Sequence, residues 1–233
     1  MLAVSGLESA YTAGQSHKMI AEPDVALTDY ALTAETLILG FWIRRSYTSS
    51  PLKKWFMLLF WSIGVAAVIG GTVHGFVTSP DSYMGKLLWL TTMSVLGITA
   101  LSEYGIAAHL LFNSGLANIF ISCASVIFVL YEAVILFWNG TFRMAVIDYI
   151  GGLIFLFIAF SRLYLRDRSR AAVIGIAGLL LTLTASIVQQ AHISFNPRYF
   201  NHNALYHSLE GIALFLIYRA GRAWLLEPSA ETT

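Results

Sequence analysis

The sequence has few charged residues for its length. Only 12% of its 233 residues are Asp, Glu, Lys or Arg, whereas 57% are hydrophobic. Because a soluble domain has about 25% charged residues, this scarcity excludes a soluble globular enzyme and a disordered protein. The net charge of +1 also lacks the basic excess of a nucleic-acid-binding protein. The composition therefore indicates a helical membrane protein.

Residues and motifs that particular functions require are also missing. The single cysteine, Cys123, excludes an intrachain disulfide. A retinal protein needs a Schiff-base lysine in its last helix, and no lysine lies there, so we expect no retinal. The HExxH, Walker A and GxSxG motifs are absent as well.

Seven stretches are long and apolar enough to predict membrane-spanning helices, each of which needs about 20 mostly apolar residues. All five prolines lie outside them, as expected because proline breaks helix interiors. The predicted fold is all-α, a seven-helix transmembrane bundle over residues 27–226. Its helices cover residues 27–43, 55–77, 86–111, 116–138, 142–163, 171–194 and 203–224.

The distribution of lysine and arginine predicts the orientation of this bundle. Ten of these residues fall on one side of the predicted spans and four on the other, and the richer side is expected to be cytoplasmic. We therefore predict an exterior N-terminal tail over residues 1–26 and a cytoplasmic C-terminal tail over residues 227–233. Residues 1–26 lack the basic start and continuous apolar core of a signal peptide.

Polar side chains within the predicted spans point to a site. Ionisable groups in a bilayer cost several kcal/mol, so they tend to face the bundle interior and mark function. Measured at about 1.5 Å per residue from the middle of each span, most of them fall in the outer half. We predict one polar chamber there, between the second, fifth, sixth and seventh spans. The residues in this outer half are His74, Glu132, Asp148, Gln189, His192, His207 and Glu210.

Residue spacing in the last span predicts which of these polar side chains lie on the same helix face. Asn203, His207 and Glu210 are spaced by four and three residues, so they share one helix face. A histidine and a carboxylate one turn apart can bind one metal, or can act as a base and its orienting group. On the sixth span Gln189 and His192 lie on a similar stripe.

Seven spans, an exterior N-terminus, His74 late in the second span and His207 early in the last resemble the alkaline ceramidase and adiponectin/progestin-receptor superfamily. Several stretches resemble more closely a bacterial seven-helix family without an assigned activity, which implies the bacterial cytoplasmic membrane. These stretches are Glu22-Pro23 to Thr28-Asp29, Gly70 to Phe76, Ile147 to Tyr149, Val188 to Gln190 and Phe200 to His207.

The ceramidase-like resemblance implies a zinc-dependent hydrolase of lipid amides or esters. His74 and His207 match two zinc histidines of that superfamily. Asn203 stands at the first histidine of its HxxxH motif, and Gly70 stands at its serine. A third nitrogen would then come from His202 or His192, and the carboxylate that takes the proton from zinc-bound water would be Asp148 or Glu210.

A non-enzymatic role is the alternative. The chain would then be an accessory or assembly subunit of a membrane complex, or a sensor that binds a lipid or another ligand. In that case Asn203, His207, Glu210 and Asp148 form a hydrogen-bond network, and Glu132 and Gln189 join helices. The expected partners are membrane lipids and proteins of a membrane complex.

Overall fold

The structure, a computed structural model, describes residues 20–77, 79, 81–138 and 140–226. Most of the predicted exterior tail (residues 1–19) and the predicted C-terminal tail (residues 227–233) lie outside this range. The described residues form seven helices and one isolated β-bridge between Asn196 and Phe200. The helices are α2 (Pro23–Arg44), α3 (Leu52–Phe76), α4 (Tyr83–Leu111), α5 (Ser114–Phe137), α6 (Phe142–Asp167), α7 (Arg170–Gln190) and α8 (His202–Leu226).

The helices begin at residues whose side chains compensate for unpaired backbone N–H groups. Ser82, Asn113 and Ser169 each precede a helix and accept a hydrogen bond from the backbone N–H three residues later. Pro23 is the first residue of α2, where the missing N–H of proline costs nothing. The predicted first span therefore starts four residues too late, and Asp29 lies well inside α2 rather than at its end.

The end of α7 also differs from the prediction. The helix stops at Gln190, not at residue 194, and the chain turns through His192 in a left-handed conformation with φ 54°. The predicted helical stripe of Gln189 and His192 is therefore wrong, because His192 does not belong to the helix. His202, in contrast, is the first residue of α8.

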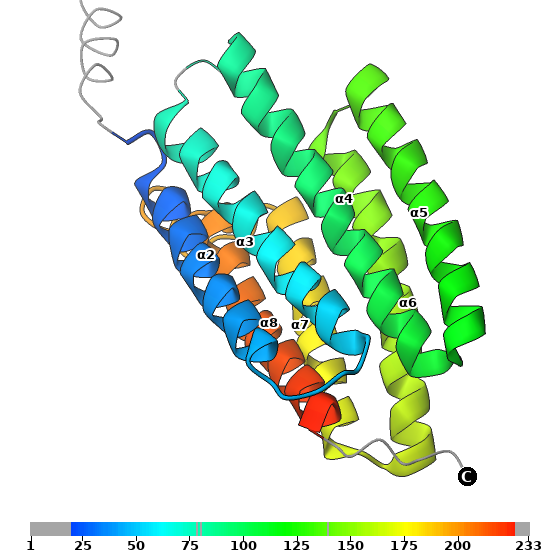
Figure 1. Cartoon of the computed structure of the whole chain (residues 1–233). Helices are drawn as coiled ribbons and strands as arrows, with labels where there is room; N and C mark the ends of the chain where they lie inside the picture. Colours follow the sequence, from blue (N-terminus) through cyan, green and yellow to red (C-terminus); the bar gives the residue numbers. More distant parts are fainter. Residues whose placement is uncertain (1–19, 78, 80, 139, 227–233) are drawn as a thin grey trace, which may run out of the picture.

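Six of the seven described helices form a closed ring, and the remaining helix, α5, packs on the outside of this ring. Around the ring, α2 packs on α3, α3 on α4, α4 on α6, α6 on α7, α7 on α8, and α8 returns to α2. Figure 1 shows α5 at the edge of the bundle beside α4. Successive helices run in opposite directions, so α2 begins at one end of the bundle and α8 finishes at the other (Figure 1).

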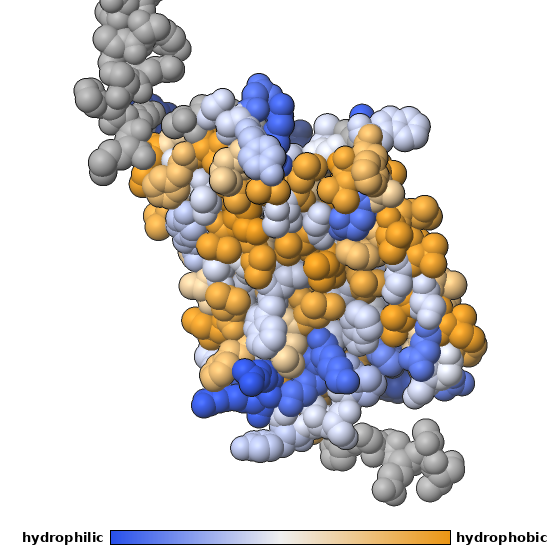
Figure 2. Space-filling view, turned by 45° about the horizontal axis from the view of Figure 1, so that its top comes forward, coloured by the Kyte–Doolittle hydropathy of each residue, from blue (hydrophilic) through white to orange (hydrophobic). Residues whose placement is uncertain are grey.

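Of the seven helices in the described part of the chain, five are long and apolar enough to cross a membrane, namely α3 to α7. Figure 2 shows apolar side chains over the middle of one face and hydrophilic ones gathered mainly at one end. The two remaining helices, α2 and α8, are adjacent in the ring and carry polar residues that face the cavities described below.

The apolar core fills the end of the ring at which α3 and α7 begin. Phe56, Phe60, Phe160 and Tyr218 are fully buried there, and the ring of Trp224 lies 4.7 Å from that of Phe160. Close packing of these aromatic rings closes this half of the bundle. The opposite half holds the candidate site.

Candidate functional site

The ring encloses a cavity of about 240 Å³ near the end at which α3 stops and α8 begins. All six ring helices contribute to its wall, whereas the sequence predicted only four of them. No lysine or arginine is among the described residues that line it, so its charged groups are carboxyls and histidines. Its polar lining residues are Asp29, His74, Thr92, Thr99, Tyr149, Ser186, Gln189, Gln190, Asn203, Tyr206, His207 and Glu210.

His207 joins α8 to α2 at the cavity wall. Its Nε2 atom lies 3.3 Å from Asp29 Oδ1, and its Nδ1 atom lies 3.2 Å from Thr28 Oγ1. The Thr28 hydroxyl also lies 3.0 Å from the carbonyl oxygens of Asp24 and Val25. Two proton arrangements fit: Thr28 donates to these carbonyls while it accepts from Nδ1–H and Asp29 is protonated, or Thr28 turns its proton to Nδ1 while Nε2–H faces an ionised Asp29. In both arrangements the histidine is held between a hydroxyl and a carboxyl group.

His74 is held by a carboxylate of its own, at the end of the ring nearest the exterior in the predicted topology. Its Nδ1–H donates to Glu22 Oε2 over 2.6 Å. This hydrogen bond is the largest influence on Glu22 and lowers its pKa below the usual value. The backbone N–H groups of Ala21 and Glu22 also donate to the carbonyls of Gly75 and His74. The segment before α2 is therefore fastened to the end of α3.

Two buried carboxyl groups in the cavity wall retain hydrogen-bonding capacity. Glu210 is 4% exposed, and its Oε1 accepts from the hydroxyl of Thr182 over 3.4 Å. Among the described residues, no partner reaches Glu210 Oε2 or Asp29 Oδ2. Buried polar atoms nearly always have a partner, so these two oxygens indicate where a ligand or water would be bound.

The predicted helix face of α8 is present. Asn203, His207 and Glu210 all line the cavity. Gln189 reaches this face from α7 and donates through Nε2 to Asn203 Oδ1 over 3.3 Å. Of the predicted site residues, the structure therefore brings together His74, Gln189, Asn203, His207 and Glu210.

Asp148 and Glu132 do not join them. Neither residue lines the cavity. Glu132 belongs to α5, which lies outside the ring, and its Oε2 accepts from Ser94 on α4 over 2.8 Å. Asp148 interacts electrostatically with Glu132 rather than with the cavity groups. The prediction that Asp148 and Glu132 belong to the same chamber as His207 is therefore wrong. Glu132 is on the fourth predicted span, which packs on the outside of the ring, and Asp148 is on α6, a ring helix that contributes Tyr149 rather than Asp148 to the cavity wall.

His192 and His202 also differ from their predicted role. They contact each other, with 3.0 Å between His192 Nδ1 and His202 Nε2, and neither lines the cavity. Within the described ranges, no group of three or more His, Cys, Asp or Glu side chains is arranged to hold a metal ion. The expected zinc ligands His74, His207, His202 and His192 therefore do not converge among the described residues.

A family model matches residues 25–226 of the chain. The chain belongs to DUF6962, a family of unknown function. The matched segment of this DUF6962 chain contains all residues that line the cavity, whereas Glu22 precedes it. No curated protein and no solved structure matches the chain. The ceramidase-like resemblance therefore stays a prediction, as does zinc binding.

Sequence reasoning missed the α2 side of the site in this DUF6962 chain. Asp29, Thr28 and Glu22 supply the partners of both cavity histidines. The sequence contains a signal for Asp29. A helix that starts at Pro23 places Asp29 in its second turn and not at its solvated end. If that helix spans the membrane, the Asp29 carboxyl group is an ionisable group within the bilayer, and such groups often mark function.

Proposed function

We propose that this DUF6962 chain crosses the membrane seven times and binds a small ligand in the outer half of its helix ring. The ten lysines and arginines of the predicted cytoplasmic side support an exterior N-terminus and a cytoplasmic C-terminus. The low hydropathy of α2 and α8 is compatible with spanning, because Asp29, His207 and Glu210 face an internal cavity. A C-terminal reporter that functions only in the cytoplasm tests the orientation.

One observation carries the binding proposal. Two buried carboxyl groups, Asp29 and Glu210, line one cavity and each keeps one unpartnered oxygen. With no lysine or arginine among the described lining residues, the lining favours a ligand that donates hydrogen bonds, above all an amine. A volume of about 240 Å³ suits a small molecule or the head group of a lipid rather than a whole lipid.

Thermal unfolding of the purified full chain in detergent, with and without ethanolamine, tests this proposal. We expect ethanolamine to raise the Tm of the natural protein, because a ligand that binds only the folded state stabilises it. Acetate, which lacks donors, should not do so. Asp29→Asn and Glu210→Gln should each weaken ethanolamine binding by about tenfold, which corresponds to about 1.4 kcal/mol.

Glu132→Gln is the matched control, since Glu132 also has a buried unpartnered oxygen but lies outside the cavity. It should respond to ethanolamine as the natural protein does. An equal response in all four proteins would contradict the proposal, and so would a response to acetate alone.

Zinc-dependent hydrolysis, which the ceramidase-like resemblance implies, is tested separately by metal analysis of the purified protein. Stoichiometric zinc in a folded sample would support the predicted role of His74, His207, His202 and His192. Zinc below a tenth of an equivalent with the fold retained would contradict it. The accessory-subunit alternative needs neither zinc nor hydrolysis, and it predicts co-purification of a membrane protein partner.

A second candidate function, metal-free hydrolysis of a lipid ester or amide, rests on the contacts of His207. In this reaction Thr28 Oγ1 attacks the carbonyl carbon while His207 Nδ1 takes the hydroxyl proton. The bond to the leaving alcohol or amine then breaks, and His207 returns the proton to that group. Water hydrolyses the resulting Thr28 ester, which releases the acid and restores the hydroxyl. Asp29 orients the imidazole and stabilises its charged form.

Hydrolysis of p-nitrophenyl butyrate and laurate by the purified chain tests this reaction. Thr28→Val preserves the shape of the side chain and should abolish hydrolysis. Thr33→Val, one helical turn and a half further along α2, removes a hydroxyl that bonds to backbone carbonyls and should leave the rate unchanged. Equal rates for Thr28→Val and the natural protein would exclude the mechanism.

A further inference from the structure

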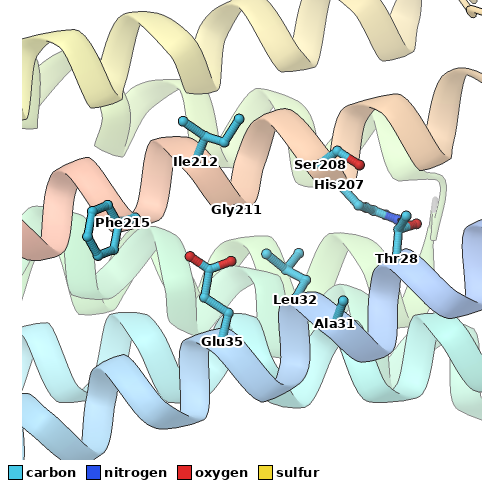
Figure 3. A pocket seen from close by; sticks show the side chains of 9 residues that line it. All are labelled: Thr28, Ala31, Leu32, Glu35, His207, Ser208, Gly211, Ile212 and Phe215. Carbon is cyan, nitrogen blue, oxygen red and sulfur yellow. The ribbon is translucent and has the colours of Figure 1, made fainter.

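A second cavity lies between α2 and α8, on the other side of His207 from the central one. It is a groove of about 350 Å³ whose walls come only from these two helices. His207 of α8 and Leu32 of α2 line both cavities and lie between them. Figure 3 shows Thr28 and His207 meeting at one end of the groove, and Phe215 at the other.

Side chains along this groove are mostly apolar and partly exposed. Ile212 is 57% and Phe215 41% exposed, as expected for side chains that meet the acyl chains of lipids on the outside of a bundle. Leu32 of α2 forms the opposite side. The groove thus opens laterally, and a ligand would enter it from the membrane rather than from water.

Glu35 is the one carboxyl group among the described residues that line this groove. Figure 3 shows its carboxyl group rising from α2 towards Gly211 of α8. Glycine leaves room for it, because a methyl group at residue 211 would lie 2.7 Å from Glu35 Oε2. Among the described residues no group donates a hydrogen bond to this carboxyl, and no lysine or arginine lines the groove. A half-buried carboxyl group in an apolar wall without a partner calls for an external cation or donor.

The depth of Glu35 restricts what that partner is. It lies twelve residues after Pro23 and nine before Arg44, which is about 18 Å and about 14 Å along the helix at 1.5 Å per residue. The head group of a bilayer phospholipid stays at the interface, so its amine does not reach this depth. A phosphate group would also meet the carboxyl group rather than a basic residue.

We propose that the α2–α8 groove is a binding site for a hydrophobic organic amine that partitions into the membrane, with its ammonium group on Glu35 and its hydrocarbon body along Leu32, Ile212 and Phe215. The ion pair forms where water is scarce, which strengthens it relative to an exposed pair. This site is distinct from the central cavity, and its occupant differs in carrying an apolar chain.

Octylamine is the probe, and 1-octanol is its matched neutral counterpart. Binding is measured with the purified full chain in nanodiscs of phosphatidylcholine, by calorimetry and by the shift of Tm. We expect saturable binding of octylamine at least tenfold tighter than that of octanol. Glu35→Gln should remove this preference, whereas Glu132→Gln, which changes a carboxyl group on the opposite side of the bundle, should retain it.

Gly211→Ala tests the groove site without changing the Glu35 carboxyl group. The added methyl group takes the room next to Glu35 Oε2, so octylamine affinity should fall several-fold. Equal affinities for octylamine and octanol in the natural protein would overturn the proposal, as would an unchanged preference in Glu35→Gln. Ethanolamine is measured in the same samples, so a negative result with octylamine leaves the central-cavity proposal standing.

Discussion

The two halves of the helix ring differ in how they are filled. The half at which α3 and α7 begin is packed with aromatic rings, among them Phe56, Phe160 and Tyr218, and is closed. The half at which α8 begins is hollow, and carboxyl and imidazole groups line it. The same six helices therefore form a close-packed core at one end and a polar cavity, the proposed ligand site, at the other. Substitutions that separate these two properties test the comparison.

The largest effect is expected from Phe160→Ala in the packed half. Phe160 is fully buried against Gly175 and Trp224, so truncation leaves a cavity that the surrounding aromatic rings fill poorly. We expect a loss of about 3–5 kcal/mol in the free energy of unfolding, measured by denaturant titration in detergent micelles. The remaining folded protein should bind ethanolamine as before.

Phe120→Ala is the control for this change. Phe120 belongs to α5, is 41% exposed and stacks on Phe155 outside the ring. Truncation of Phe120 should lower the free energy of unfolding much less than Phe160→Ala does. A loss as large as that of Phe160→Ala would show that packing outside the ring matters as much as packing within its closed half.

A smaller effect is expected from adding one methyl group to a glycine in each half. At Gly178 of α7 the methyl group would lie 2.9 Å from the carbonyl oxygen of Ala213, a backbone atom that cannot move aside alone. Gly178→Ala should therefore cost about 1–3 kcal/mol. At Gly70, which lines the cavity, the nearest atom is Asp29 Oδ2 at 3.5 Å.

Gly70→Ala should leave the Tm unchanged or slightly raised, because alanine favours the helix. It should instead weaken ethanolamine binding, since the methyl group narrows the cavity next to Asp29. Both variants are compared by thermal unfolding and ligand titration. Equal destabilisation by the two substitutions would contradict the distinction between a packed and a hollow half.

The smallest effect is expected from acidification of the Glu22–His74 contact. Because the hydrogen bond from His74 lowers the pKa of Glu22, the folded state binds the proton less readily than the unfolded state does. The contribution of Glu22 to stability is thus full above its unfolded pKa and is lost as pH falls through its lower folded value. The Tm of Glu22→Gln should fall less on acidification than that of the natural protein.

Parallel slopes of Tm against pH for the two proteins, between pH 7 and pH 3, would show that this contact does not stabilise the fold. Asp81→Asn is the control, because Asp81 is a highly exposed carboxyl group whose contact with Lys86 spans 3.6 Å.

The sequence predicts an all-helical chain and the positions of the helices well, because apolar runs of this length have few alternatives. It also predicts that Asn203, His207 and Glu210 share a face, since helical spacing alone decides this. It does not predict that α5 leaves the ring. Residue spacing gives the position of a side chain along its helix. The direction in which that side chain points within the bundle depends on which helices pack together, and the sequence does not show this.

That limit explains the two principal errors. Glu132 and Asp148 share with His207 a predicted place in the outer half of the spans, but neither lines the cavity, and Glu132 contacts Ser94 of α4 instead. His192 falls outside its predicted helix because α7 ends after Gln190, and nothing in the apolar run before it signals that stop. Asp29 was not predicted as a site residue because α2 begins at Pro23, before the apolar run starts, so Asp29 lies further inside the helix than the apolar run indicates.

The pairing of α8 with α2 has a consequence for biosynthesis. The chain is made from α2 towards α8, so in the proposed seven-span topology Asp29 enters the membrane long before His207 exists to contact it. Until α8 arrives, the ring is open and the carboxyl groups of α2 lack the enclosure that the finished wall provides. The central cavity is thus the last part of the ring to be completed, because α8 supplies one of its walls. In the proposed topology, a chain whose synthesis stops before α8 would expose these carboxyl groups to lipid.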